Sequence, residues 1–345
     1  MSADATAEAD RFGTAPHPRE RATLLGHGEA ETLIREAWDA GRLPHALLIG
    51  GREGIGKATL AYRVARFVLS GGAAPAGSLE LPPDHPTFRQ VGALSHPDLL
   101  VLRRTAGEGG KLPSTIPAEQ VRRLKAFFGS TAALGGWRVC IVDTLDEMNA
   151  QGANALLKTL EEPPSRALFL LVSHAPGRLL PTIRSRCRMM ALRALSTEEV
   201  VAALEGLAAA MPDLDRTRFA EAAEASGGSA REALALLSGD GLAIRKATAE
   251  LLATLPNIDP KALHALGERL QGDRGGAFDN FVSTVESWIS DHATGRRQTV
   301  SVRLARLPEV WEKVHRAAVD ADVYNLDRKT FVFRIFATLD EAVRP

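Results

Sequence analysis

The sequence predicts an α/β domain with a parallel sheet and a phosphate-binding loop, followed by two domains made of helices alone. Three observations support this fold class. Gly51-x-x-x-x-Gly56-Lys57 lies between a short apolar run and an amphipathic stretch, which is the context of a phosphate loop between strand and helix. Apolar runs alternate with helical patterns up to about residue 195, as in a parallel sheet covered on both faces. Beyond that point the patterns are helical.

The elements of the α/β domain follow from local patterns. Helices are expected at 31–40, at 57–69, within 116–128 and within 149–164. Strands are expected at 46–50, 99–102, 137–142, 167–173 and near the end of 183–195. The segment 71–92 is rich in Gly, Pro and Ala and shows little periodicity, so we interpret it as a surface excursion.

The domain boundaries follow from composition and from changes of pattern. The expected domains are a disordered tail over 1–21, the α/β domain over 22–194, a small helical lid over 195–240 and a helical domain over 241–345. Ser196-Thr197-Glu198-Glu199 predicts a helix start, and Ser226-Gly227-Gly228-Ser229 predicts the cap of a further helix. The last domain is expected to hold helices at about 242–255, 258–271, 275–294, 300–320 and 326–343.

Composition and charge argue against several classes of protein. With 42 basic and 42 acidic residues the chain has no net charge, and therefore no global attraction to nucleic acid or to a membrane surface. No apolar run approaches the ~20 residues of a membrane span, and the amino-terminal residues lack the apolar stretch of a signal peptide. Cys140 and Cys187 are too few for a disulfide framework or a four-cysteine zinc site. We therefore expect a cytoplasmic protein with no zinc and no membrane partner.

The loop from Gly51 to Lys57 has the residues that hold phosphate. Gly51, Gly54 and Gly56 allow backbone N–H groups to turn toward phosphate oxygens, and Lys57 adds a positive charge at a helix N-terminus. The next position, which should carry a hydroxyl for Mg²⁺, is Ala58. Thr59 belongs to the same candidate site, but it lies about 100° further round the helix and is not expected to replace that hydroxyl.

A second group of candidates follows the strand that ends at Asp143. A carboxylate at the tip of a buried strand beside a phosphate loop would orient Mg²⁺ or its waters. The next position, where hydrolysing proteins of this fold carry a glutamate, is Thr144. Asp146 and Glu147 are expected to start the following helix, where carboxylates are favoured. The chain therefore lacks two groups that position phosphoryl transfer.

Two arginines stand out further along the chain. Ser185-Arg186-Cys187 is flanked by Arg184 and Arg188, and these charges form either a solvated face or an arginine finger across a subunit boundary. Arg231 opens a helix after Gly227-Gly228-Ser229, where a basic residue opposes the helix dipole. Its position therefore suggests a phosphate or an acidic partner.

Six stretches taken together resemble the clamp-loader ATPases of bacterial DNA polymerase III, which belong to the AAA+ class. They are HGEAETLIREAWDAGRLPHALLIGGREGIGKATLAYRVA, HPDL, NALLKTLEEPP, the Ser173-His174 pair, IRSRC and GGSAREAL. The resemblance covers about residues 22–240, and the helical remainder suits the collar domain of that family. It implies a P-loop AAA+ parallel-sheet domain, a small helical lid domain and an all-α collar domain that serves oligomerisation.

The resemblance also distinguishes two branches of the family. The gamma/tau branch hydrolyses ATP, carries Thr after the loop lysine and Glu after the strand-end Asp, and holds a four-cysteine zinc module. The delta-prime branch lacks working catalytic residues. Ala58, Thr144 and the two cysteines of this chain match the delta-prime branch, although the zinc cysteines usual near the excursion at 71–92 are missing. The chain keeps a more complete phosphate loop than many delta-prime chains, so ATP binding to it is left open.

The resemblance implies roles and partners. Delta-prime chains act as a stator in a five-subunit ring with gamma/tau and delta subunits, which loads the sliding clamp onto primed DNA. By carry-over, Arg186 would reach the ATP of the adjacent gamma subunit in trans. Lys57 and Arg231 would contact phosphate if nucleotide binds here, and Ser173 would be the sensor position on the fourth strand.

Two alternatives remain open at this point. The chain could instead be a working ATPase, either gamma/tau-like or a standalone AAA+ motor, although on these residues it is not expected to hydrolyse ATP by itself. It could also bind DNA directly through Arg122, Arg123 and Lys125, a hypothesis against which the zero net charge argues.

Overall fold

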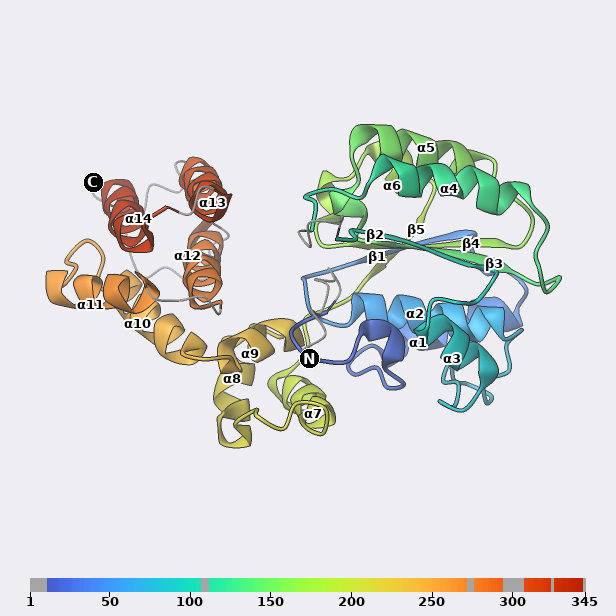
Figure 1. Cartoon of the computed structure of the whole chain (residues 1–345), viewed down its shortest axis with the longest axis horizontal. Coiled ribbons are helices and arrows are strands. Elements are labelled where there is room, and N and C mark those ends of the chain that lie inside the picture. Colours follow the sequence, from blue (N-terminus) through green and yellow to red (C-terminus); the bar gives the residue numbers. More distant parts are fainter. Residues whose placement is uncertain (1–10, 107–111, 272–275, 294–306, 324–325, 344–345) are drawn as a thin grey trace, which may run out of the picture. The chain divides into compact units, whose positions relative to one another are not determined.

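The computed structural model describes residues 11–106, 112–271, 276–293, 307–323 and 326–343, and the chain falls into two compact units. One unit holds residues 1–216 with 227–231, and the other holds residues 217–226 with 232–345. Figure 1 shows strands only in the first unit among the described residues. The domain boundaries expected at 194 and 240 stay a prediction.

The first unit is built on one parallel sheet, as the apolar runs predicted. Its strands are β1 (Ala46–Gly50), β2 (Leu99–Arg103), β3 (Arg138–Asp143), β4 (Ala167–Ser173) and β5 (Arg188–Ala191), in the order β2-β3-β4-β1-β5. Every residue of β1, β3 and β4 is buried, which is why these strands read as continuous apolar runs. β5 is an edge strand with mostly exposed residues. The predicted fold class of a parallel sheet followed by helices is therefore confirmed.

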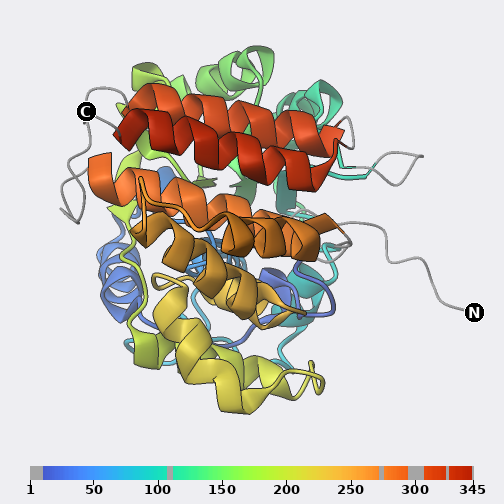
Figure 2. The same ribbon diagram turned by 90° about the vertical axis from the view of Figure 1, so that its left-hand side faces the viewer.

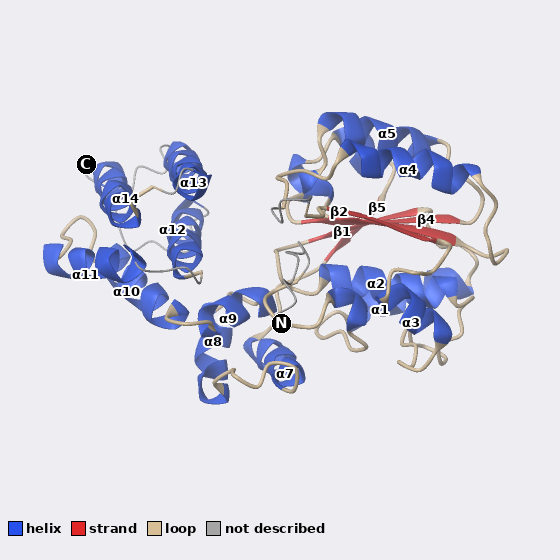
Figure 3. Ribbon diagram, in the orientation of Figure 1, coloured by secondary structure: helices blue, strands red, loops and turns tan. Residues whose placement is uncertain are grey.

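Helices cover both faces of this sheet (Figure 3). One face carries α1 (Gly28–Asp39), α2 (Lys57–Leu69) and α3 (Pro86–Gly92), whereas α4 (Ala118–Gly129), α5 (Ala150–Glu161) and α6 (Pro181–Arg184) lie on the other. The unit also contains α7 (Thr197–Ala208) and the short 3-10 turns η1 (Pro18–Glu20), η2 (Leu145–Glu147) and η3 (Pro176–Arg178). The expected helix start at Ser196 is confirmed, because Ser196 and Glu199 form a capping box.

Two segments of the first unit are more ordered than their composition suggests. The excursion at 71–92 contains α3, and its side chains Leu79, Leu81, Phe88 and Val91 join the core on the α2 side of the sheet. Residues 11–21 were expected to belong to a disordered tail, yet they include the turn η1 and the buried side chain of Arg19. The part of the predicted tail at 1–10 lies outside the described residues.

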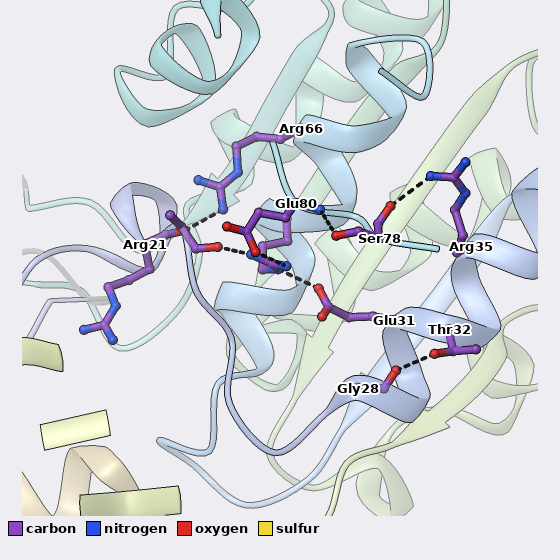
Figure 4. Close-up of polar contacts among 10 residues, drawn as sticks. Arg21, Gly28, Glu31, Thr32, Arg35, Arg66, Ser78 and Glu80 are labelled. Carbon is purple, nitrogen blue, oxygen red and sulfur yellow. Dashed lines mark hydrogen bonds and ion pairs between the residues drawn. The ribbon is translucent and has the colours of Figure 1, made fainter. Parts of the chain in front are cut away.

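Buried arginines hold these two segments to the helices (Figure 4). Arg66 on α2 donates hydrogen bonds to the carbonyl oxygens of Arg19 (3.2 Å) and Arg21 (2.6 Å). Arg63, one turn earlier, forms an ion pair with Glu31 on α1 (2.6 Å). Further contacts run from Arg35 to the carbonyl oxygens of Pro75 and Ser78 and from Arg63 to the Ala22 carbonyl and the Glu80 carboxylate. Guanidinium groups therefore bind the backbone carbonyls of segments that lack regular structure of their own.

The described residues of the second unit form helices and the turns that connect them, with no strand among them. Its helices are α8 (Phe219–Ala225), α10 (Gly241–Ala253), α11 (Pro260–Gln271), α12 (Ala277–Ala293), α13 (Leu307–Val323) and α14 (Arg328–Val343), together with most of α9 (Ala230–Leu237). Helices α12, α13 and α14 run side by side (Figure 2) and share a core with α10 and α11 that includes Phe281 and Phe336. The expected helical residues 300–306 lie outside the described part. Within the described ranges, no helix is both long enough and apolar enough to cross a membrane.

Candidate phosphate site

The phosphate loop lies at the carboxyl end of β1, between β4 and β5. It runs from Gly51 to Gly56, and α2 begins at the next residue, Lys57. Gly56 caps α2 with a φ of 104°, a left-handed conformation that favours glycine. The Gly51 N–H donates a hydrogen bond to the carbonyl oxygen of Ser173 at the end of β4 (3.2 Å). The loop is therefore tied to the neighbouring strand at its start and leads directly into a helix N-terminus, where anions are favoured.

The ammonium group of Lys57 is buried beneath this loop. The residue is 3% exposed, and its Nζ donates a hydrogen bond to the carbonyl oxygen of Arg52, 2.5 Å away. Burial lowers the pKa of Lys57 to about 8, while the negative charges of Glu53, Asp143 and Asp146 act in the opposite direction. A buried cation beneath a glycine-rich loop is the group that would hold a phosphate oxygen.

A buried histidine that the sequence did not single out supports the loop. The Nε2 of His27, just before α1, lies 2.7 Å from the carbonyl oxygen of Ile55. Because a carbonyl oxygen only accepts hydrogen bonds, this ring nitrogen carries the proton. Burial lowers the pKa of His27, which favours the neutral ring. A Cβ added at Gly56 would lie 3.1 Å from Leu24 and 3.7 Å from His27, so this side of the loop has little spare room.

The residues around the loop fit a phosphate group better than they fit a metal ion. The methyl group of Ala58 offers no oxygen ligand at the first turn of α2, and Thr59 is half-buried one position further on. Asp143 is buried at the tip of β3, and the Thr144 that follows it is buried too. No three His, Cys, Asp or Glu side chains gather to hold a metal ion within the described residues. Phosphate binding would therefore depend on Lys57 and on the loop amides.

Ser173 and Asp146 form a hydrogen-bonded pair, of which the sequence had indicated only Ser173 as a candidate site residue. Ser173 ends β4, is fully buried, and donates a hydrogen bond through Oγ to the Asp146 carboxylate (2.9 Å). The backbone N–H groups of His174 (2.6 Å) and Ala175 (3.2 Å) donate to the same carboxylate. The expectation that Asp146 starts the next helix was wrong, since α5 begins only at Ala150. Asp146 lies in the turn η2 because it satisfies the end of a strand that is distant in sequence.

Removing this carboxylate should loosen the end of β4. We expect Asp146→Ala to speed amide hydrogen exchange at His174 and Ala175 by about tenfold, because hydrogen bonds to a charged acceptor contribute about 1.5–3 kcal/mol and this acceptor is partly exposed. Asp84→Ala, which removes an exposed carboxylate on the excursion, is the control. Equal exchange rates in both variants would show that Asp146 does not support the strand end.

Arg231 lies beside the phosphate loop. Its Nε is 3.1 Å from Oε1 of Glu53, a residue of the loop. The acidic group that Arg231 meets in this structure is therefore part of the chain itself. Its guanidinium group also lies over the ring of Phe12, 5.6 Å from the ring centroid. Sequence analysis missed Glu53, because a carboxylate at a variable position of a glycine loop has no periodic signal.

Arg186 lies at the amino end of the strands, whereas the phosphate loop lies at their carboxyl end. It follows α6 and precedes β5, whereas the loop follows β1, and these two strands are parallel neighbours. Because Arg188 pairs with Leu47 and Ala191 with Gly50, the two positions are separated along the strands by the length of β5, roughly 13 Å. The side chain of Arg186 is 36% exposed and forms an ion pair with Glu161 at the end of α5 (2.9 Å). Cys187 beside it is partly buried against the core.

The candidate residues thus divide into two places. The residues that the structure brings to the carboxyl end of the sheet are Gly51, Gly54, Gly56, Lys57, Thr59, Asp143, Ser173 and Arg231. Arg186 lies apart from them, at the amino end of β5. The basic residues Arg122, Arg123 and Lys125 are exposed on α4, a helix on one face of the sheet.

Comparison with known proteins finds a matching family model and similar chains. The family model described as DNA polymerase III, delta subunit, matches residues 26–196. The delta-prime subunit of DNA polymerase III from Pseudomonas aeruginosa is 40% identical over 185 residues, which are 54% of this chain and 53% of that protein. The Escherichia coli K12 delta-prime subunit is 34% identical over 230 residues, 65% of this chain and 64% of that protein.

A tau subunit of DNA polymerase III is also similar. The tau subunit of DNA polymerase III from Escherichia coli K12 is 29% identical over 272 residues, covering 76% of this chain and 40% of that protein. The chain spans between about half and two thirds of the length of the two delta-prime relatives. The family match and these delta-prime relatives together show that the chain is similar to the delta-prime subunits of DNA polymerase III.

Proposed function

We propose that the chain is a non-hydrolysing subunit of a DNA polymerase III clamp loader and supplies Arg186 to the ATP of a neighbouring subunit. The observation that carries this proposal is the separation of Arg186 from the chain's own phosphate loop. An arginine at the amino end of β5 does not reach nucleotide at the carboxyl end of β1. Its charge is available to another chain.

The residues of the loop support the absence of hydrolysis. Ala58 removes the hydroxyl that would hold Mg²⁺, and Thr144 stands where a glutamate would polarise the attacking water. Phosphoryl transfer depends on positioning and charge, so the loss of both groups leaves a site suited at most to binding. ATP is the nucleotide we propose for it, held by Lys57 and the loop amides.

The surroundings of Arg186 support its release toward a partner. Its ion pair with Glu161 joins two partly exposed side chains, and pairs of this kind contribute only about 0–1 kcal/mol. Breaking the pair therefore costs little compared with the stabilisation of a charged transition state, where an arginine finger contributes about 10³–10⁵ in rate. The proposed neighbour is a gamma/tau subunit. A delta subunit, the sliding clamp and primed DNA are the further proposed partners of the complex.

ATP turnover by the purified chain tests the absence of hydrolysis. We expect no turnover above that of a Lys57→Ala variant, because the hydroxyl and the glutamate are both missing. Turnover by the purified chain that Lys57→Ala abolishes would instead support a gamma/tau-like ATPase, the alternative that the similarity to tau favours. Co-purification of gamma/tau and delta subunits with the tagged full-length chain tests its place in the complex, and their absence would contradict it.

Direct DNA binding through α4 stays a separate prediction. Arg122, Arg123 and Lys125 are exposed, but the chain carries no net charge. DNA binding by the isolated chain that weakens steeply with salt, and that Arg122→Ala reduces, would support it.

A further inference from the structure

A segment that begins at Gly227 closes the phosphate loop on its outer side. The Nη1 of Arg52 donates a hydrogen bond to the Gly227 carbonyl oxygen (3.1 Å), and the Ala230 N–H donates to the Gly54 carbonyl oxygen (3.0 Å). A Cβ added at Gly54 would lie 2.3 Å from Oγ of Ser229 and 3.1 Å from the backbone nitrogen of Arg231, so the segment packs against the loop too closely for a side chain at this position. Loop and segment are therefore joined by one side-chain and one main-chain hydrogen bond.

The two cations that would meet a phosphate are both paired within the chain. Arg231 forms its ion pair with Glu53 of the loop, at 3.1 Å. Lys57 donates to the carbonyl oxygen of Arg52, which belongs to the same loop. Phe12 covers the guanidinium group of Arg231 as well, with its ring centroid 5.6 Å away. A carboxylate and a carbonyl thus take positions beside the cations that phosphate oxygens would take.

We propose that Glu53 is an internal substitute for a nucleotide phosphate, which holds the segment 227–231 on the loop and weakens nucleotide binding. We call this arrangement the loop latch: Glu53 paired with Arg231, together with the hydrogen bond from the Arg52 side chain to the Gly227 carbonyl and the main-chain hydrogen bond from Ala230 to Gly54. A phosphate that enters the loop must displace the carboxylate from Arg231 and must also tolerate a negative charge next to it. The segment therefore keeps its place without nucleotide, as suits a subunit that does not cycle with hydrolysis.

The test compares ATP binding by full-length variants, measured by calorimetry in EDTA because the loop lacks the usual metal ligand. We expect Glu53→Gln to tighten ATP binding about tenfold, since it removes a negative charge and frees Arg231. Arg231→Gln also opens the latch but removes a phosphate ligand, so it should not tighten binding. The double variant should lose the gain. Glu36→Gln, at an exposed glutamate of α1, is the matched control and should bind ATP like the unaltered chain.

Hydrogen exchange gives a second readout that needs no nucleotide. Both Glu53→Gln and Arg231→Gln should speed exchange at the Ala230 amide, which donates to the loop. Unchanged ATP affinity in Glu53→Gln, or unchanged exchange at Ala230 in both variants, would overturn the proposal. The latch concerns only the chain's own loop, so this result and the co-purification experiment fail or succeed separately.

Discussion

Replacing Arg186 by alanine is expected to slow hydrolysis at one nucleotide site of the reconstituted clamp loader by about a thousandfold. The size follows from the contribution of an arginine finger to the transition state for phosphoryl transfer. The affected site is the one on the neighbouring subunit that Arg186 is proposed to reach. In single-turnover hydrolysis of ATP by the complex, a slow phase should appear while the other sites react as before.

The controls separate this effect from a loss of structure. Arg184→Ala removes an exposed arginine two residues earlier and should leave every phase unchanged. Arg186→Ala should fold and assemble normally, because its ion pair with Glu161 is partly exposed and its hydrogen bonds to Thr182 and Ser185 lie within its own turn. If the complex with Arg186→Ala showed the same single-turnover kinetics as the unaltered complex, Arg186 would not act on the ATP of a neighbouring subunit.

Arg66→Ala should have the largest effect on stability, lowering the free energy of unfolding of the first unit by about 3–5 kcal/mol. Arg66 is 2% exposed, donates to two backbone carbonyls and lies over the ring of Phe88, 4.2 Å from its centroid. Burial lowers the pKa of Arg66 to about 10, so the side chain is still charged at neutral pH. The alanine variant leaves a cavity and leaves two carbonyl oxygens without their hydrogen-bond donor. Each of these changes lowers the free energy of unfolding by about 1 kcal/mol or more.

Hydrogen exchange across α2, α3 and residues 11–22 measures this loss. The exposed Arg42→Ala is the matched control, and it should alter exchange little because surface substitutions usually stay within about 0.5 kcal/mol. Arg66→Lys should lie between the two, since an ammonium group keeps the charge but lacks the planar fork that reaches both carbonyls. If Arg66→Ala exchanged like Arg42→Ala, the buried arginine would not hold the segment in place.

Much of the fold could be predicted from local pattern alone. β1 and α2 have the predicted bounds, and β4 does too, because each is a fully apolar run or follows a glycine loop of fixed spacing. The capping box at Ser196 is another signal contained within four residues. Such elements depend on neighbours in sequence, and the sequence therefore predicts them well.

The features that sequence analysis missed depend on partners far along the chain. Asp146 looked like a helix start, but its hydrogen-bond donors lie 27 to 29 residues later, at the end of β4. Arg66 reads as a polar residue of an amphipathic helix, yet its acceptors are carbonyls 45 and 47 residues earlier. Every residue has a backbone carbonyl, so no pattern of residue types in the sequence predicts the contacts of Arg66. The ion pair between Glu53 and Arg231 was not predicted either, because the two residues are far apart in the sequence.

One comparison tests the central claim most directly: single-turnover ATP hydrolysis by the complex reconstituted with Lys57→Ala or with Arg186→Ala. The proposed division of labour predicts that Arg186→Ala introduces a slow phase, whereas Lys57→Ala leaves the kinetics as they are in the unaltered complex. Assembly of both variants into the complex is checked by co-purification. Loss of a hydrolysis phase with Lys57→Ala, together with normal kinetics for Arg186→Ala, would show that this chain uses its own loop for hydrolysis and would contradict the account.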